Sequence, residues 1–451
     1  MANIIHRSKL TNFFFIISII LRLANNTTSD FSFLILAFLC FFGIREIIIS
    51  LFLTWLFSSL NSGIFPPIYS GNILRYLVIL AAFISSFNNL KLRSVIFNKN
   101  LYLVSIILFI FLLFHSIFIS KIPELSILRS ISWLLFFTLL INCWSNLNED
   151  DLSRLLKNIF FIFTTITLLS LFFVKSKIGY LKNNEGFQGI LNHPQLFGIV
   201  MSLFGIFILT SFKKKISTSF FYFTIFVIVI VFLILSESRT AIFAFLGSYI
   251  ILLISNYFFD KKNRKYKNSL ILIIVLAPLL VFISIYSLFI LNSIFDIALL
   301  DNILTKSGRS DNVESLFEIY SESRGNLVLD SYNNIIKNFW TGIGFGIASD
   351  HENMKIYKDV LFNIPYSAPM EKGVLYVAIF EEIGFIGIII FLFFLTICLI
   401  SIMSSGSNYF SLFSIILLLN FGESTFFSTG GAGGLLLLFF SLSITRKVFI
   451  K

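Results

Sequence analysis

The sequence predicts an all-α polytopic membrane protein with about 12–14 transmembrane helices and one large, partly helical outer loop. Hydrophobic residues make up 57% of the 451 residues and charged residues only 13%, whereas a soluble domain carries about 25% charged residues. The mean hydropathy is +0.92. Nearly uncharged runs such as 101–119 and 269–291 reach or approach the ~20 residues that span a bilayer core. These observations exclude a soluble multidomain protein.

Fourteen apolar segments are predicted as spans. Residues 11–60 allow a second interpretation, because Arg45 and Glu46 interrupt the apolar pattern there. One span in this region instead of three gives twelve in total and leaves both termini on the same side. The fourteen predicted spans are 11–25, 31–43, 46–60, 72–88, 101–119, 126–144, 153–174, 189–211, 218–236, 239–257, 269–291, 373–402, 408–421 and 430–446.

Lysine and arginine gather in short connections between the predicted spans, and this sets the predicted orientation. Basic clusters lie at 91–99, 213–215 and 261–267, and such clusters mark cytoplasmic loops. Both termini are then cytoplasmic. Because these clusters account for much of the net charge of +11, a nucleic-acid-binding surface is disfavoured and no nucleic-acid partner is expected.

The segment 292–372 differs from the rest of the chain in its charge. It carries 11 acidic and 7 basic residues, which suits the outer side of the membrane. It is also too long for a simple connection, and long loops in compact proteins are usually functional. We therefore divide the chain into N-terminal transmembrane helices (1–291), a large periplasmic loop (292–372) and C-terminal transmembrane helices (373–451).

Two arginines stand on the predicted outer side, against the charge bias of the other loops. Arg239 immediately precedes a span, and Arg324 lies in an amphipathic helical pattern over 311–339. A guanidinium at the membrane boundary is costly unless it meets an anion, and its planar fork matches phosphate oxygens. The alternative is that each arginine pairs with a neighbouring glutamate: Glu237, Glu318 or Glu322.

A glycine-rich run, Gly342-Ile-Gly344-Phe-Gly346, follows the amphipathic pattern. It does not qualify as a dinucleotide-binding fingerprint, because no strand precedes it and it lies outside the cytoplasm. We interpret it instead as a backbone turn that lets chain or ligand approach closely.

Two acidic residues mark the beginning of the predicted helix 372–402. Pro369 is predicted at the first helical position and Glu371 in the first turn. Glu382 lies three turns further along the same face, about 16 Å away. Since the helix would be about 46 Å long, Glu382 would stand at the outer boundary of a ~30 Å membrane core. Glu371 is either a catalytic base or an acid that complements the helix dipole.

His193 is the candidate substrate-binding residue of a second outer segment, 186–198, which leads into a predicted span. The histidines are not at metal-ligand spacing. The three cysteines lie in apolar runs, which suits buried thiols: Cys40, Cys143 and Cys398. We therefore predict no metal and no cofactor.

Taken in chain order, these motifs resemble the O-antigen ligase and O-antigen polymerase superfamily of membrane glycosyltransferases. Asn192-His-Pro-Gln195 is similar to the family's Pro-Asn segment before a span, and Ser238-Arg239 to its Ser-Arg pair. Arg324 followed by the glycine run is similar to its Arg…Gly-x-Gly loop. Glu382-Ile-Gly-Phe-Ile-Gly387 looks like its helix motif, and Phe421-Gly-Glu-Ser424 like a late-span segment. The resemblance covers roughly 180–445.

The resemblance implies a GT-C-like enzyme of the bacterial inner membrane that transfers a polyprenyl-diphosphate-linked oligosaccharide to an acceptor glycan or glycolipid at the outer face. Arg239 and Arg324 would stabilise the diphosphate leaving group in place of a metal. Glu371 would assist the acceptor hydroxyl as a base, while His193, Gly344 and Glu382 would contact substrate. The lipid bilayer and other polysaccharide-assembly proteins are the expected partners.

Three functions stay open at this point. Ligases of this family carry His-Asn at the beginning of the helix after the loop, where this chain has Glu371-Lys372. We therefore predict a polymerase of O-antigen or exopolysaccharide repeat units, with an O-antigen ligase that joins polymer to lipid A-core as the alternative. A lipid-linked-sugar flippase or transporter is the third, although such folds often have internal repeats and none is evident here.

Overall fold

The computed structural model describes residues 2–68, 71–88, 98–180, 186–212, 219–259, 326–358, 365–367, 372–403 and 406–445. Within these ranges the chain forms fourteen α-helices, two short 3-10 turns and one two-stranded antiparallel sheet. Six of these described helices are long and apolar enough to cross a membrane. The predicted class, an all-α polytopic membrane protein, is confirmed.

Thirteen of the fourteen predicted spans correspond to one described helix each, and 269–291 lies outside the described residues. The N-terminal helices are α1 (Ala2–Ala24), α2 (Asn26–Leu39), α3 (Ile44–Ser58), α4 (Gly71–Asn88), α6 (Lys99–Phe118), α7 (Pro123–Asn146) and α8 (Glu149–Leu171). The later ones are α9 (Pro194–Ser211), α11 (Phe220–Leu235), α12 (Arg239–Phe259), α16 (Asn326–Lys337), α17 (Leu375–Ile402), α18 (Ser407–Leu419) and α19 (Gly431–Thr445). The short elements are η1 (Cys40–Phe42), η2 (Lys177–Gly179), β1 (Tyr357–Lys358) and β2 (Pro365–Ser367).

Local sequence signals explain where several helices begin. Asn25 and Asn148 accept hydrogen bonds from the first turns of α2 and α8 through their side chains, as N-cap residues do. α7 and α9 begin at Pro123 and Pro194, because proline at the first position gives up no helical hydrogen bond. His193, the residue before α9, accepts a hydrogen bond from the Gln195 amide.

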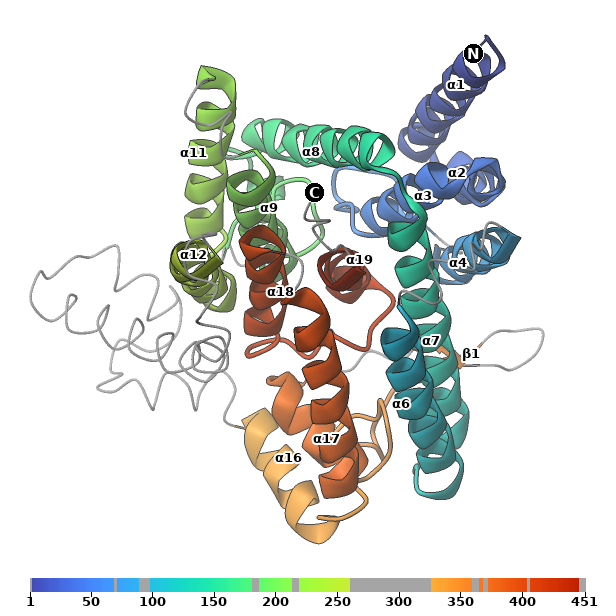
Figure 1. Ribbon diagram of the computed structural model, residues 1–451, viewed down its shortest axis with the longest axis vertical. Helices are drawn as coiled ribbons and strands as arrows, with labels where there is room; N and C mark the ends of the chain where they lie inside the picture. Colours follow the sequence, from blue (N-terminus) through green and yellow to red (C-terminus); the bar gives the residue numbers. More distant parts are fainter. Residues whose placement is uncertain are drawn as a thin grey trace, which may run out of the picture.

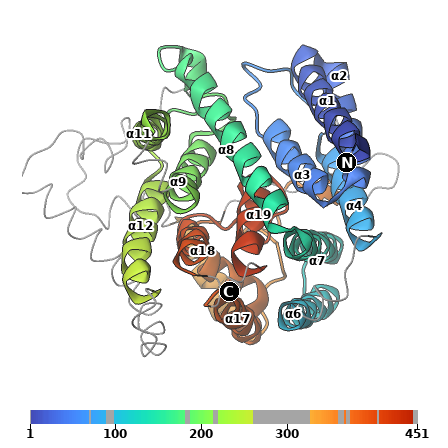
Figure 2. The ribbon, with the colours of Figure 1, turned by 45° about the horizontal axis from the view of Figure 1, so that its top comes forward.

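The helices pack as a bundle around α9 and α19 (Figures 1 and 2). Every residue of α19 from Gly433 to Thr445 is buried, and α19 contacts α7, α17 and α18. A helix that is apolar all round is expected in the interior. The peripheral helices instead expose large apolar side chains, such as Phe118 and Phe220, as lipid-facing surfaces do.

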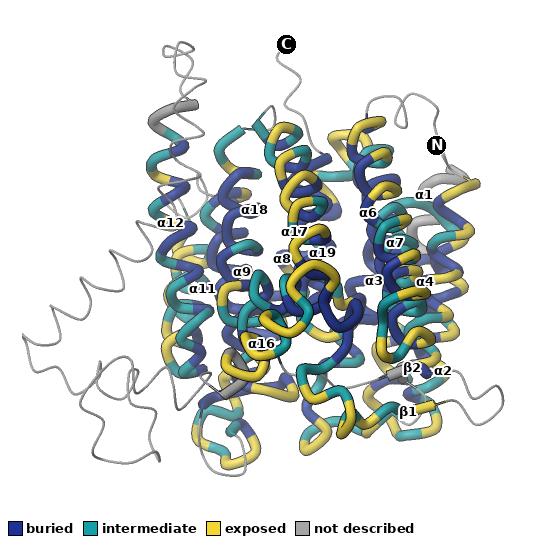
Figure 3. Tube along the Cα trace, turned by 90° about the horizontal axis from the view of Figure 1, so that it is seen from below, coloured by how far each residue is buried: buried dark blue, intermediate teal, exposed yellow. Residues whose placement is uncertain are grey.

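The connections predicted to lie on one side of the membrane meet at one end of the bundle. The Asn61 amide donates to the Ile190 carbonyl at 2.9 Å, and the Phe187 amide to the Leu235 carbonyl at 2.8 Å. The Lys121 amide donates to the Ile343 carbonyl of the large loop. Figure 3 shows α16, β1 and β2 at this same end, which we call the loop end. The alternation of spans predicted from the sequence is consistent with these contacts.

The predicted geometry of the helix after the large loop is wrong in two respects. α17 begins at Leu375, with Val374 extended before it, which is later than the predicted beginning at 372, while Pro369 and Glu371 lie outside the described residues. The Leu375 amide bonds to the Asn420 carbonyl, which fixes the beginning of the helix there. α17 is also not straight, because Gly384 adopts φ 65° and ψ −171° and breaks it. The single straight helix predicted over 372–402 is therefore replaced by a helix that begins at Leu375 and breaks at Gly384.

Candidate functional site

The break in α17 provides the attachment point for the glycine run. Helix carbonyls that lose their partners at a break need other donors, and the loop supplies them. The Ile343 amide donates to the Glu381 carbonyl and the Gly344 amide to the Glu382 carbonyl, both at 2.9 Å. Gly342, Gly344 and Gly346 all have positive φ. The predicted close backbone turn is confirmed, and it brings Gly344 directly onto the segment that carries Glu382.

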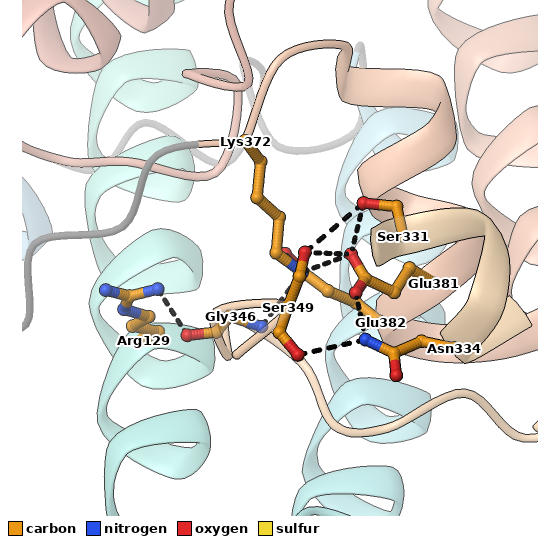
Figure 4. A network of polar contacts seen from close by, with 8 residues as sticks. All are labelled: Arg129, Ser331, Asn334, Gly346, Ser349, Lys372, Glu381 and Glu382. Atoms are coloured by element: carbon orange, nitrogen blue, oxygen red, sulfur yellow. Dashed lines mark hydrogen bonds and ion pairs between the residues drawn. The ribbon is translucent and has the colours of Figure 1, made fainter. Parts of the chain in front are cut away.

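Glu381 lies at the centre of a buried polar network (Figure 4). Its carboxylate accepts hydrogen bonds from Asn334 at 2.7 Å, Ser331 at 2.9 Å and Ser349 at 3.0 Å. Lys372 Nζ lies 2.9 Å from Glu381 Oε2. The Glu381 side chain is fully buried, so these four donors replace the water that would otherwise solvate the carboxylate. The network ties α16 and the loop after it to α17.

The loop beyond Ser349 is closed by Asp350 and Asn353. Asn353 Nδ2 donates to Asp350 Oδ2 at 2.8 Å, and the Asn353 amide donates to Oδ1 at 3.3 Å. These hydrogen bonds favour the charged carboxylate and hold the pKa of Asp350 below its usual value. The connection after the network is thereby held in a turn.

Glu382 joins the network to the glycine run and to a cavity. Lys372 Nζ lies 3.1 Å from Glu382 Oε1, and the Gly346 amide donates to Glu382 Oε2 at 2.7 Å. The Gly346 carbonyl in turn accepts a hydrogen bond from Arg129 on α7. Glu382 is thus held on both oxygens. Figure 4 shows Arg129 bonded to Gly346, and the Glu382 carboxylate interacts electrostatically with Arg129.

A cavity of about 380 Å³ opens beside Glu382 at the loop end. Its size falls within the range of small-molecule sites. It lies between α4, α7, the first turns of α17 and the segment that leads into α19. Its polar lining comes from Arg75, Arg129, Ser132, Glu382, Ser424, Thr425, Ser428 and Thr429, with the glycines at 430, 431 and 433.

Both arginines of the cavity pack against glycine backbone. A Cβ on Gly346 would lie 2.5 Å from Arg129 Cδ, and one on Gly430 would collide with the Arg75 guanidinium. Gly430 lies outside the left-handed region of backbone conformation. The lack of a side chain at Gly430 therefore makes room for the Arg75 guanidinium and is not required by the backbone conformation.

Asn420 shapes the wall of the cavity between α18 and α19. Its side-chain oxygen accepts from the Thr425 and Phe426 amides at 3.1 Å each, and its amide donates to the Ile416 carbonyl at 2.8 Å. Asn420 is fully buried, so this one side chain satisfies three backbone groups of the connection. The neighbouring Gly422 packs closely on Thr240, the residue after Arg239.

Arg239 and His193 belong to a second group of motifs at the loop end. The two segments touch, because a Cβ on Gly198 would lie 2.4 Å from Ser238 Cβ and one on Gly186 2.9 Å from the Ser236 carbonyl. Arg239 is the first residue of α12 and is half-buried, while His193 is exposed. The connection 420–434 links this group to the cavity, since Gly422 contacts Thr240 and residues from Ser424 onward line the cavity.

Two predicted catalytic residues, Arg324 and Glu371, lie outside the described residues. The described part of the predicted amphipathic helix 311–339 is α16. Sequence reasoning did not single out Arg75 or Arg129. Both stand inside predicted spans, and an arginine within an apolar helix is itself a sign of function, so this signal was present in the sequence. Lys372 was noted only as part of the pair Glu371-Lys372, and nothing in the sequence indicated its ion pairs.

Metal ligands are not gathered in the part of the chain that the structure describes. There, no three His, Cys, Asp or Glu side chains lie close enough together to hold an ion. The cysteines at positions 40, 143 and 398 are buried.

Comparison with protein families gives a match between residues 224–392 and the model of the O-antigen ligase family. The matched segment runs from α11 to the middle of α17 and includes Arg239, the glycine run, Glu381 and Glu382. The match confirms the resemblance to the O-antigen ligase and O-antigen polymerase superfamily over this segment, and it supports glycosyl transfer of this general type. Comparison with curated proteins finds no match to the chain.

Proposed function

We propose that this protein polymerises O-antigen or exopolysaccharide repeat units at the outer face of the bacterial inner membrane. A hydroxyl of one lipid-linked glycan attacks the anomeric carbon of another. The bond from that carbon to the diphosphate breaks, a glycosidic bond forms, and polyprenyl diphosphate leaves. The observation that carries the proposal is the family match over 224–392, which includes the glycine run and the two glutamates.

The chemistry of the leaving group supports the proposal. A diphosphate needs no proton to depart if cations stabilise its charge, and guanidinium groups bind phosphate oxygens through two parallel hydrogen bonds. We assign this role to Arg239 and Arg324, substrate contacts to His193, Gly344 and Glu382, and the role of base toward the acceptor hydroxyl to Glu371. The large periplasmic loop 292–372 would hold the glycans. In the chain it connects the N-terminal transmembrane helices (1–291) to the C-terminal transmembrane helices (373–451). We propose a metal-independent reaction.

The pair Glu371-Lys372 favours polymerase over ligase, because the ligases carry His-Asn there. Lys372 is buried between Glu381 and Glu382 and so is committed to an ion pair. A strain that lacks the gene separates the activities on a gel of surface glycan. Loss of a polymerase leaves single repeats on the final acceptor, which gives one short band. Bare acceptor together with long lipid-linked chains would instead identify a ligase, and repeats retained on the inner leaflet would identify a flippase.

Arg239 provides the direct test of the diphosphate role. Arg239→Ala is expected to abolish glycan transfer while the protein remains in the membrane. Arg239→Lys should restore little activity, because lysine lacks the planar fork. Transfer would be measured by glycan length in a deletion strain that carries each variant. Wild-type chain length with the lysine variant would show that charge alone suffices.

The proposed orientation has both termini in the cytoplasm and the loop end outside. Ser349 hydrogen-bonds to Glu381, so a cysteine there would disturb the network, and the exposed Glu352 is the better probe. Glu352→Cys should react with a membrane-impermeant thiol reagent in cells whose outer membrane has been opened. Asp150→Cys, also exposed but at the beginning of α8, should not. The reverse labelling pattern would overturn the orientation.

A further inference from the structure

Among the residues that the structure describes, Arg75 is the arginine of the cavity whose charge no carboxylate compensates. Lys372 is shared by Glu381 and Glu382, and Arg129 interacts electrostatically with Glu382. The Arg75 Nε is buried and has no hydrogen-bond partner in the described part of the chain.

The other groups of the cavity suit an anion as well. The Arg75 guanidinium carbon lies 5.1 Å from the Tyr76 ring centroid. A cation–π contact of this kind uses no N–H donor, so the N–H groups of Arg75 can still donate hydrogen bonds to an anion. α19, a helix of 15 residues, begins at Gly431 in the cavity wall. Helix N-termini attract phosphate because their first amides have no partner within the helix. Hydroxyls of Ser132, Ser424 and Ser428 also line the space.

We propose that this cavity binds the diphosphate of one of the two lipid-linked glycans between Arg75 and Arg129, an assignment that rests on the proposed function. Joining two polyprenyl-diphosphate-linked glycans brings two diphosphates to one enzyme, so two cationic sites are required. Arg239 stands in the other motif group at the loop end, formed by 186–198 and 236–240, while the cavity is formed by α4, α7, α17 and the beginning of α19. The two groups provide separate places for the two anions.

Gly430 gives the sharpest variant, since it changes the position of Arg75 without changing charge. A Cβ there would displace the end of a flexible side chain, and the backbone conformation accepts alanine. Gly430→Ala should therefore fold normally and weaken binding. In a double-mutant cycle, Gly430→Ala should add little to the loss caused by Arg75→Gln, because both act through the same guanidinium.

The experiment measures the affinity of the purified full-length protein in detergent for polyprenyl diphosphate. Arg75→Gln, Arg129→Gln and Gly430→Ala should each weaken binding by roughly tenfold or more at the cavity site. Arg154→Gln, an exposed position on α8, is the matched control for charge and should bind like wild type. Wild-type affinity in the first three, with normal elution on gel filtration, would overturn the proposal.

Two competitors identify the source of the anion. Inorganic pyrophosphate should compete at the cavity site, since the arginines contact only phosphate. Displacement by phosphatidylglycerol at equal concentration would assign the cavity to bulk lipid headgroups and overturn the substrate assignment. Arginine-dependent binding in a protein that transfers no glycan would refute the proposed function and leave the anion site. If glycan transfer is unaffected in all three variants, the cavity is not the diphosphate site, and the proposed function stands without it.

Discussion

Glu381 and Arg75 are both charged side chains in otherwise apolar helices at the loop end, yet their surroundings differ. Glu381 is enclosed by four donors from four other residues and has no exposed surface. Arg75 faces a cavity and has no ion-pair partner among the described residues. A buried charge that the protein satisfies completely serves to position chain segments. One left facing a cavity is available to a ligand.

The largest effect on stability is expected from Glu381→Ala. It removes one partner of a buried ion pair, leaves Lys372 with Glu382 alone, and removes the carboxylate shared by the donors of the network, which costs about 3–5 kcal/mol. The thermal unfolding midpoint of the purified protein should fall markedly. Glu124→Ala is the control, because Glu124 and Lys358 form an exposed pair at 3.3 Å and such pairs contribute about 0–1 kcal/mol. Equal effects of the two variants would contradict the positioning role.

Gly384→Ala comes next, because it tests whether the network depends on the break in α17. Gly384 occupies a backbone conformation that side chains rarely adopt, and a Cβ would collide with the Trp340 carbonyl. We expect a loss of about 1–3 kcal/mol from the backbone strain alone, before the collision. Gly431 also has a positive φ, but a Cβ there would meet no atom. Gly431→Ala should therefore lower the free energy of unfolding by less than Gly384→Ala does. A smaller loss at Gly384 than at Gly431 would show that the break can move.

The smallest effect on stability is expected from Arg75→Gln. The variant removes the packing of the guanidinium on Gly430 and a cation–π contact with Tyr76, of which the latter contributes about 0.5–1 kcal/mol at a partly exposed site. Removing an uncompensated charge offsets part of that loss. The unfolding midpoint should therefore remain close to wild type while transfer falls. A loss as large as that of Glu381→Ala would show that Arg75 is held by the fold and erase the contrast between the two residues.

The sequence by itself determined the helical membrane class and the alternation of its spans. Hydropathy and basic clusters are properties of single segments, so each span can be predicted from its own residues without knowledge of its neighbours in space. The glycine run was also recognisable as a close turn, because only glycine tolerates positive φ at three alternating positions. The beginning of α17 could not be recognised from the sequence, because Pro369 and Glu371 gave a stronger local signal for a helix start than Val374 did. The Leu375–Asn420 hydrogen bond that fixes it is not local.

The tertiary structure alone decided which charges meet. Lys372, Glu381 and Glu382 are close in sequence, but their pairing depends on the break at Gly384 and on donors from α16. Arg75, Arg129 and Gly430 are separated by tens to hundreds of residues and come together only because α7 packs against both α4 and α19 beside one cavity. Spacing along a chain carries no information on such contacts. Packing brings the ends of distant helices together, and the chemistry of a site depends on those contacts.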